Sequence, residues 1–99
     1  MKTAFTRSFA QDLKKCAKQR NLLSQVREVI LEVEAAEAPA SISNIKKLKT
    51  DGPYYRIRLG DYRLGVIIEI ETVTFVRLLH RKEIYRYFPL RGWTRRSRV

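Results

Sequence analysis

The sequence predicts an α+β fold in which an N-terminal helical hairpin packs on one face of a small, twisted, mostly antiparallel sheet. Two observations predict it. Apolar residues recur at helical spacing up to Pro39, and beyond Gly52 they alternate with a period of two. The expected order of elements is therefore β-α-α-β-β-β. Because the 99 residues contain no long linker and no internal repeat, we expect a single domain over residues 1–99.

The N-terminal part predicts a short strand over residues 2–6 and then a first helix. Ser8, with Gln11 three residues later, forms a capping box that begins this helix. Its inward stripe is Phe9, Leu13, Cys16 and Ala17, and its outward charged face is Asp12, Lys14, Lys15 and Lys18. Asn21 marks the break before the second helix.

The second helix is expected over residues 25–38, because Pro39 disfavours the helical conformation in the residue before it. Its inward stripe consists of Leu23, Val26, Ile30 and Val33. Residues 40–52 show no periodic pattern. We expect them to form an irregular connector that ends in the turn signal at residues 51–53.

Alternation beyond Gly52 predicts three strands. The first covers residues 54–59, and a tight turn at residues 60–61 leads into the second. In the second strand Leu64, Val66, Ile68 and Ile70 share one face, and Arg63, Gly65, Ile67 and Glu69 share the other. After a turn near residues 71–72, residues 73–79 are apolar on both faces and therefore predict an interior strand.

The charge is large and unevenly distributed. The chain has 21 Lys and Arg against 10 Asp and Glu, a formal net charge of +11. Residues 1–45 carry 7 basic and 5 acidic side chains, and residues 46–99 carry 14 and 5, so the C-terminal half holds +9 of the excess. Such a field indicates a polyanionic partner, a nucleic acid or an acidic protein. The weaker alternatives are a basic protein without a charged partner and an acidic membrane surface, for which no basic amphipathic helix is present.

Cysteine usage and hydropathy point to the cytoplasm. The single cysteine, Cys16, cannot form an internal disulfide, as is usual in a reducing compartment. No apolar run approaches the roughly 20 residues needed to cross a bilayer. The first residues lack the continuous apolar stretch of a secretory signal. We therefore expect a cytoplasmic protein without a membrane partner.

Strand alternation makes one geometric prediction about a site. If Ile57 and Leu64 face the core, then Arg56, Arg58 and Arg63 project together from the opposite face of the sheet. The planar guanidinium fork suits bidentate binding of phosphate oxygens. The alternative is an ordinary solvated face, which usually carries charges of both signs. We therefore expect a phosphate-binding face.

The end of the last strand offers groups that transfer protons. His80 is the single histidine of the chain, Arg81 follows it, and Tyr85 lies five residues beyond it. Histidine titrates near neutral pH, and tyrosine can stack on a base or move a proton. A lone histidine is more often structural, and most tyrosines at strand ends are packing residues. Among the other tyrosines, Tyr55 is a weak candidate.

Other chemistries find little support. The acidic residues are scattered, whereas a metal nuclease clusters them, so we expect no metal and no cofactor. Cys16 has no adjacent histidine, and the glycines form no phosphate-binding loop. RNA suits a reaction driven by positive charge alone, because its own 2′-hydroxyl can attack the neighbouring phosphate.

Three segments resemble the RelE/ParE superfamily of bacterial toxins: Lys-Lys-Leu-Lys at 46–49, Tyr-Arg-Ile-Arg-Leu-Gly-Asp-Tyr-Arg-Leu at 55–64, and Leu-His-Arg-Lys-Glu-Ile-Tyr at 79–85. The resemblance implies the RelE-like fold and a toxin of a type II toxin–antitoxin system. It further implies metal-independent cleavage of messenger RNA in the ribosomal A site, leaving a 2′,3′-cyclic phosphate. A cognate antitoxin, messenger RNA and the ribosome are the implied partners, in a prokaryotic cytoplasm.

The resemblance also implies roles for single residues. Arg56 and Arg58 correspond to paired basic residues that bind the RNA backbone and assist proton transfer, and Arg63 to the arginine that stabilises the scissile phosphate. The catalytic candidates are Arg63, His80, Arg81 and Tyr85, and the phosphate-binding candidates are Arg56, Arg58, Lys46, Lys47 and Lys49. No acid matches the glutamate base that some members use.

Two alternatives to RNA cleavage remain open. Members that poison DNA gyrase share the fold, although they tend to lose the complete arginine, histidine and tyrosine set that is present here. A basic module that binds nucleic acid or an acidic partner without catalysis is the other. The basic tail over residues 88–99 extends past the shared motif, and Trp93 among its arginines suggests a contact with RNA or antitoxin, unless the end is frayed.

Overall fold

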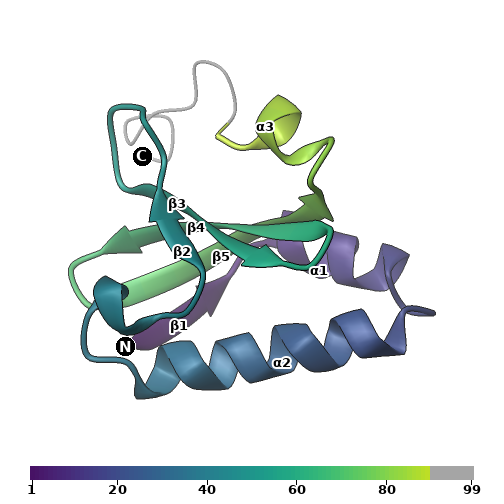
Figure 1. Ribbon diagram of the computed structural model, residues 1–99, viewed down its shortest axis with the longest axis horizontal. Coiled ribbons are helices and arrows are strands. Elements are labelled where there is room, and N and C mark those ends of the chain that lie inside the picture. Colours follow the sequence, from purple (N-terminus) through teal and green to yellow (C-terminus); the bar gives the residue numbers. More distant parts are fainter. Residues whose placement is uncertain (90–99) are drawn as a thin grey trace.

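A five-stranded sheet in the order β1-β5-β4-β3-β2 forms the centre of the computed structural model, which describes residues 1–89 (Figure 1). The elements are β1 (Lys2–Phe5), α1 (Arg7–Lys15), α2 (Arg20–Ala35), a 3₁₀ turn (Pro39–Ser41), β2 (Ile45–Lys47), β3 (Tyr54–Leu59), β4 (Tyr62–Glu69), β5 (Thr72–His80) and α3 (Ile84–Tyr87). The predicted role of Trp93 falls outside the described residues, as does the predicted tail beyond Pro89.

The topology confirms the predicted α+β class. β1 pairs with β5 in parallel, and every other pairing in the sheet is antiparallel. β5 lies between β1 and β4, so its prediction as an interior strand is confirmed. The two N-terminal helices lie on one side of the sheet and α3 lies on the other (Figure 1).

Both helices differ from prediction at their ends. α1 begins after Thr6, whose side-chain oxygen accepts a hydrogen bond from the Phe9 N–H at 3.1 Å, so Ser8 is not the cap. Thr6 also donates to the Val76 carbonyl at 3.0 Å, which ties the start of α1 to β5. α2 ends at Ala35 because Ala36 already adopts an extended conformation. Within residues 1–89, no helix is long and apolar enough to cross a membrane.

Asp12 was predicted on the solvated face of the first helix, and this prediction is wrong. Its side chain is buried, with the residue 2% exposed. Arg77 Nε donates to Oδ2 at 2.8 Å, Arg77 Nη2 donates to Oδ1 at 3.1 Å, and the Leu78 N–H donates to Oδ2 at 2.9 Å. A carboxylate can be buried when a neighbouring cation and hydrogen-bond donors replace the water molecules that would otherwise solvate it. Its partners lie more than 60 positions away in sequence, so local periodicity could not reveal them.

The main core lies between the helical hairpin and the sheet. Its largest fully buried side chains include Phe9, Phe75, Ile57, Leu64 and Leu78. The last member of the predicted second-strand stripe does not belong to it: Ile70 lies in the turn that follows β4, at φ 55°, and is 96% exposed. The turn therefore starts one residue before the predicted position.

The connector predicted as irregular over residues 40–52 contains a strand. β2 pairs with β3 through the partners Ile45 with Ile57 and Lys46 with Arg56. A three-residue strand is too short to establish an alternating pattern, so periodicity could not reveal it.

Part of the sheet face opposite the hairpin is covered. A second cluster packs there, formed by Tyr54, Ile67, Val76, Ile84 and Phe88. The Phe88 ring lies directly on β4 where Gly65 leaves space, since a Cβ at position 65 would stand 2.6 Å from two ring carbons. The exposed part of this face is consequently narrow and lies beside α3.

We expect Asp12→Ala to lower the free energy of unfolding by about 3 kcal/mol, because it leaves the Arg77 guanidinium without its buried partner. Urea denaturation followed by circular dichroism measures the loss. Glu28→Ala, on the exposed side of α2, is the matched control and should change stability by less than about 0.5 kcal/mol. Equal effects of the two substitutions would show that the ion pair does not anchor α1.

Candidate nucleic-acid interface

The register of three strands brings four predicted basic residues to one face. Arg58 lies directly opposite Arg63, and Lys46 lies directly opposite Arg56. Paired residues of antiparallel strands project to the same side of a sheet. Ile57 and Leu64, their neighbours in sequence, are buried on the hairpin side. Lys46, Arg56, Arg58 and Arg63 therefore form an arginine face on the other side.

Arg63 lies at the centre of this face. Its Nη1 donates to the carbonyls of Gly60 at 2.7 Å and Tyr62 at 2.8 Å, which fixes the guanidinium at the β3–β4 turn. Burial, followed by repulsion from Arg56, lowers the pKa of Arg63 from its ordinary value. Tyr85 acts in the opposite direction, and Arg58 and Arg81 add further repulsion. Four of the other predicted residues thus lie within electrostatic reach of one guanidinium.

Little negative charge neutralises the arginine face from within the chain. Among residues 1–89, neither Arg56, Arg58 nor Arg63 forms an ion pair with a carboxylate. The Arg81 backbone N–H donates to the Asp61 carbonyl at 2.7 Å, but its Nε lies 3.9 Å from the Asp61 carboxylate and both side chains are exposed. An exposed pair at this distance contributes little. The face therefore offers a strong positive field to an anion.

Tyr85 is the phenol that belongs to the arginine face. It lies on α3 and is 59% exposed, while its neighbour Ile84 is fully buried. Exposure leaves its hydroxyl accessible to a bound molecule. The prediction that Tyr85 lies near the arginines agrees with the electrostatic influence that it exerts on Arg63.

His80 is not brought together with the arginine face. It lies opposite Tyr62 in the register, and the two rings meet edge to face with centroids 5.5 Å apart. Tyr62 packs against the main core on the hairpin side, and its hydroxyl accepts a hydrogen bond from Gln19 at 3.1 Å. His80 Nδ1 accepts from the Lys82 N–H at 3.2 Å. His80 thus lines a small cavity of about 170 Å³ with residues of α1 and the loop after it.

The three predicted lysines are divided between the two sides of the sheet. Lys46 belongs to the arginine face, as described above. Lys47 lies opposite Tyr55, which packs against the main core, so this lysine projects to the hairpin side at the edge of the sheet. Lys49 follows β2 in the loop and is exposed. A polyanion on the arginine face would therefore meet Lys46 directly and the other two at its rim.

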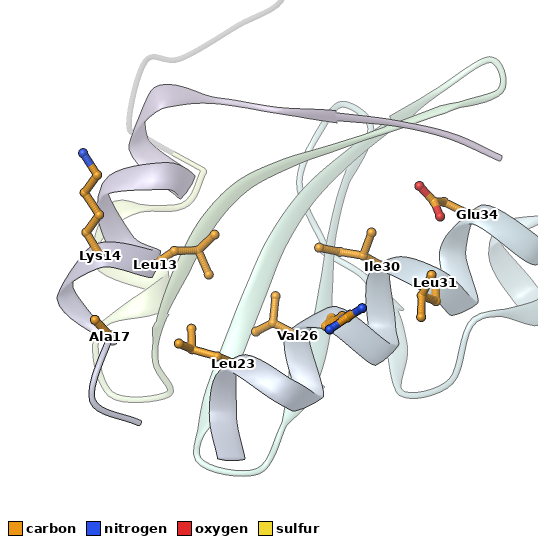
Figure 2. A pocket seen from close by; sticks show the side chains of 9 residues that line it. Leu13, Lys14, Ala17, Leu23, Val26, Ile30, Leu31 and Glu34 are labelled. Carbon is orange, nitrogen blue, oxygen red and sulfur yellow. The ribbon is translucent and has the colours of Figure 1, made fainter. Parts of the chain in front are cut away.

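Sequence reasoning missed an apolar groove between α1 and α2. Figure 2 shows Leu13 of α1 extending toward Val26 and Ile30 of α2. The groove has a volume of about 570 Å³ and is lined by Leu13, Lys14, Ala17, Leu23, Val26, Arg27, Ile30, Leu31 and Glu34. Leu31 is 57% exposed. The available signal was Leu31 itself, an apolar residue outside the predicted stripe of the second helix.

The chemical resources of the arginine face are positive charge and a phenol. Clustered guanidinium groups bind phosphate oxygens and stabilise negative charge that develops in a transition state. An exposed tyrosine ring can also stack on a nucleotide base. Within residues 1–89, no three His, Cys, Asp or Glu side chains gather into a group that could hold a metal ion. This arrangement suits recognition of a nucleic acid backbone.

Comparison with known proteins agrees with the geometry. Residues 4–85 match the family described as ParE toxin of type II toxin-antitoxin system. Toxin RelE3 of Methanocaldococcus jannaschii is 38% identical over 90 residues, which cover 90% of this chain and 100% of that protein. The RelB-RelE antitoxin-toxin complex of Methanococcus jannaschii contains a chain with a TM-score of 0.72 and 35% identity, the match covering 87% of this chain and 99% of that one.

A more distant structure shows the fold alone. The YoeB dimer from Staphylococcus aureus has a TM-score of 0.67 at 17% identity, and the match covers 81% of this chain and 95% of that one. The resemblance predicted from residues 46–49, 55–64 and 79–85 is thereby confirmed. The chain belongs to the RelE/ParE family of type II toxin–antitoxin toxins.

Proposed function

We propose that this toxin is an endoribonuclease that cleaves messenger RNA on the ribosome without a metal ion and so inhibits translation. The observation that carries the proposal is the group of cations around Arg63, with the exposed Tyr85 beside them. RNA supplies its own nucleophile, the 2′-hydroxyl, so the protein needs to hold the phosphate, stabilise charge and move protons. The relative named as a RelE toxin supports this choice of activity.

The reaction follows from the chemistry of RNA. The 2′-oxygen attacks the adjacent phosphorus and releases its proton to water, and the bond from phosphorus to the 5′-oxygen breaks. The products are a 2′,3′-cyclic phosphate and a 5′-hydroxyl. In the proposal Arg63 and Arg58 stabilise the non-bridging oxygens, and Tyr85 protonates the departing 5′-oxygen. Arg56, Arg81 and Lys46 hold the neighbouring backbone, with Lys47 and Lys49 at the rim.

One comparison separates RNA cleavage from the alternatives. The purified chain is incubated with ribosomes programmed with a messenger RNA, and in parallel with DNA gyrase and supercoiled DNA. We expect cleavage of the message and no trapping of gyrase. Trapped gyrase complexes with intact message would assign the chain to the gyrase-inhibiting members, and binding without either effect would indicate a non-enzymatic module.

We further propose that the cognate antitoxin inserts an amphipathic helix into the groove between α1 and α2. The groove has an apolar floor, and Lys14 and Arg27 at its rim favour a helix with acidic flanks. A related toxin has been crystallised with its RelB antitoxin, which supports an antitoxin as the partner. Burial of an apolar helix face in such a groove is a common mode of peptide recognition.

We expect Arg63→Ala to abolish growth inhibition while the fold persists. Loss of a preorganised charge contact raises the barrier by about 2.7–4 kcal/mol, which slows cleavage by about a hundred- to a thousandfold. Single-turnover cleavage of ribosome-bound message measures the rate. Arg7→Ala, on the exposed side of α1, is the matched control. A folded Arg63→Ala protein with undiminished activity would refute the role of Arg63.

Tyr85→Phe and His80→Gln test the two predicted proton-transfer residues separately. Tyr85 lies beside Arg63 and His80 contacts Tyr62 on the other side, so we expect the tyrosine substitution to have the larger effect on cleavage. Loss of a general acid slows a reaction by roughly 10²–10⁴-fold. Cleavage rates at saturating RNA, with binding measured in parallel, distinguish catalysis from affinity. A larger effect of His80→Gln would reverse the assignment.

We expect Leu31→Asp to weaken antitoxin binding by about tenfold or more, because it places an unpaired charge on the apolar lining of the groove. RNA cleavage by the free toxin should be unchanged, since Leu31 lies on the side of the molecule away from the arginine face. Calorimetric titration with the antitoxin measures the affinity. Leu31→Met, which keeps the site apolar, should bind normally. Unchanged affinity of Leu31→Asp would place the antitoxin elsewhere.

A further inference from the structure

The C-terminal helix α3 cannot hold its own position. It has four residues, Ile84–Tyr87, and Phe88 closes its single turn by donating its N–H to the Ile84 carbonyl at 2.8 Å. Helices of this length are not stable alone in water. Contacts with the rest of the protein must therefore fix where α3, and with it Tyr85, lies.

One contact is the packing of the Phe88 ring against β4. The ring is fully buried against the backbone of Gly65, where a methyl group would already stand 2.6 Å from the ring. Tyr54 meets the ring edge to face, with centroids 5.9 Å apart. Gly65 is two residues from Arg63 on the same face of β4, and it lies opposite Arg56 in the register. Phe88 thus brings the end of α3 next to the arginine face.

A second contact is the Arg77 guanidinium over the Tyr87 ring, 5.3 Å from its centroid. Arg77 is itself immobilised, since two of its nitrogens donate to the carboxylate of Asp12. The Tyr87 ring therefore packs against a guanidinium group whose position is fixed. The Asp12 carboxylate of α1 and the Tyr87 ring of α3 thus meet the same guanidinium group.

The two contacts restrict how α3 can turn. Phe88 and Ile84 are both fully buried against the sheet, and Tyr87, 37% exposed, lies against Arg77. Tyr85 remains on the exposed side of the turn. We propose that Tyr87 and Phe88 are positioning residues that hold Tyr85 beside Arg63 in the geometry needed for proton transfer. The inference rests on the proposed ribonuclease function and on the role of Tyr85 in it.

A double-mutant cycle tests the positioning role. Tyr87→Leu removes the ring and Tyr87→Phe keeps it, and each is made with Tyr85 present and with Tyr85→Phe. With Tyr85 present we expect Tyr87→Leu to lower kcat by about tenfold or more at unchanged KM, because misplacement of a reacting group slows catalysis without removing the RNA-binding cations. Tyr87→Phe, which keeps the ring, should have the kcat of the unaltered toxin. With Tyr85→Phe, Tyr87→Leu should have no further effect.

Hydrogen exchange at the Phe88 amide gives a second measurement that does not depend on RNA cleavage. Because this amide closes the turn of α3, Tyr87→Leu should speed its exchange and Tyr87→Phe should not. Equal slowing of kcat with and without the Tyr85 hydroxyl, or unchanged exchange in Tyr87→Leu, would overturn the inference. If the unaltered toxin cleaves no RNA, the proposed function fails, and the exchange experiment still decides whether Tyr87 holds α3.

Discussion

The ion pair between Asp12 and Arg77 is the constraint on which both sides of the sheet depend. Each carboxylate oxygen of Asp12 accepts a hydrogen bond from Arg77, and the Leu78 N–H adds a third. Burying the carboxylate without these partners would cost free energy, so the position of α1 against β5 is fixed by them. The same guanidinium contacts the Tyr87 ring and so links α1 to α3. The register shifts between Gly65, which lies opposite Arg77, and Val66, which lies opposite Phe75, so β5 holds one extra residue, Val76, at this point.

The sheet separates two kinds of surface. The hairpin side carries an apolar groove, and the opposite side carries the uncompensated arginines. An antitoxin helix seated in the groove would leave the arginine face open to RNA, because the sheet lies between them. With the antitoxin helix in the proposed position, covering the arginine face as well would take a second, acidic segment that reaches around an edge of the sheet. The uneven charge of the chain, +9 of +11 in its C-terminal half, makes such a segment electrostatically favourable.

Local patterns predicted most of the fold and the face of the sheet on which three of the arginines gather. Alternation in β3 and β4 correctly placed Arg56, Arg58 and Arg63 together, because side chains of a regular strand have two possible directions. The burial of Asp12 depends on Arg77, a partner on β5. The position of His80 depends on the face of the sheet to which the last residue of β5 points, and there it contacts Tyr62. Such features arise from packing between distant segments, which periodicity along the chain does not encode.

Gly65 links the size of one side chain to the size of another. Its missing Cβ is what lets the Phe88 ring reach the backbone of β4. The summed volume at the two positions is therefore fixed by the sheet and not by either residue alone. A relative with alanine or serine at the first position should carry a smaller side chain at the second, or a displaced C-terminal segment. Correlated substitution of these two positions would thus record the docking of α3 through the evolution of the family.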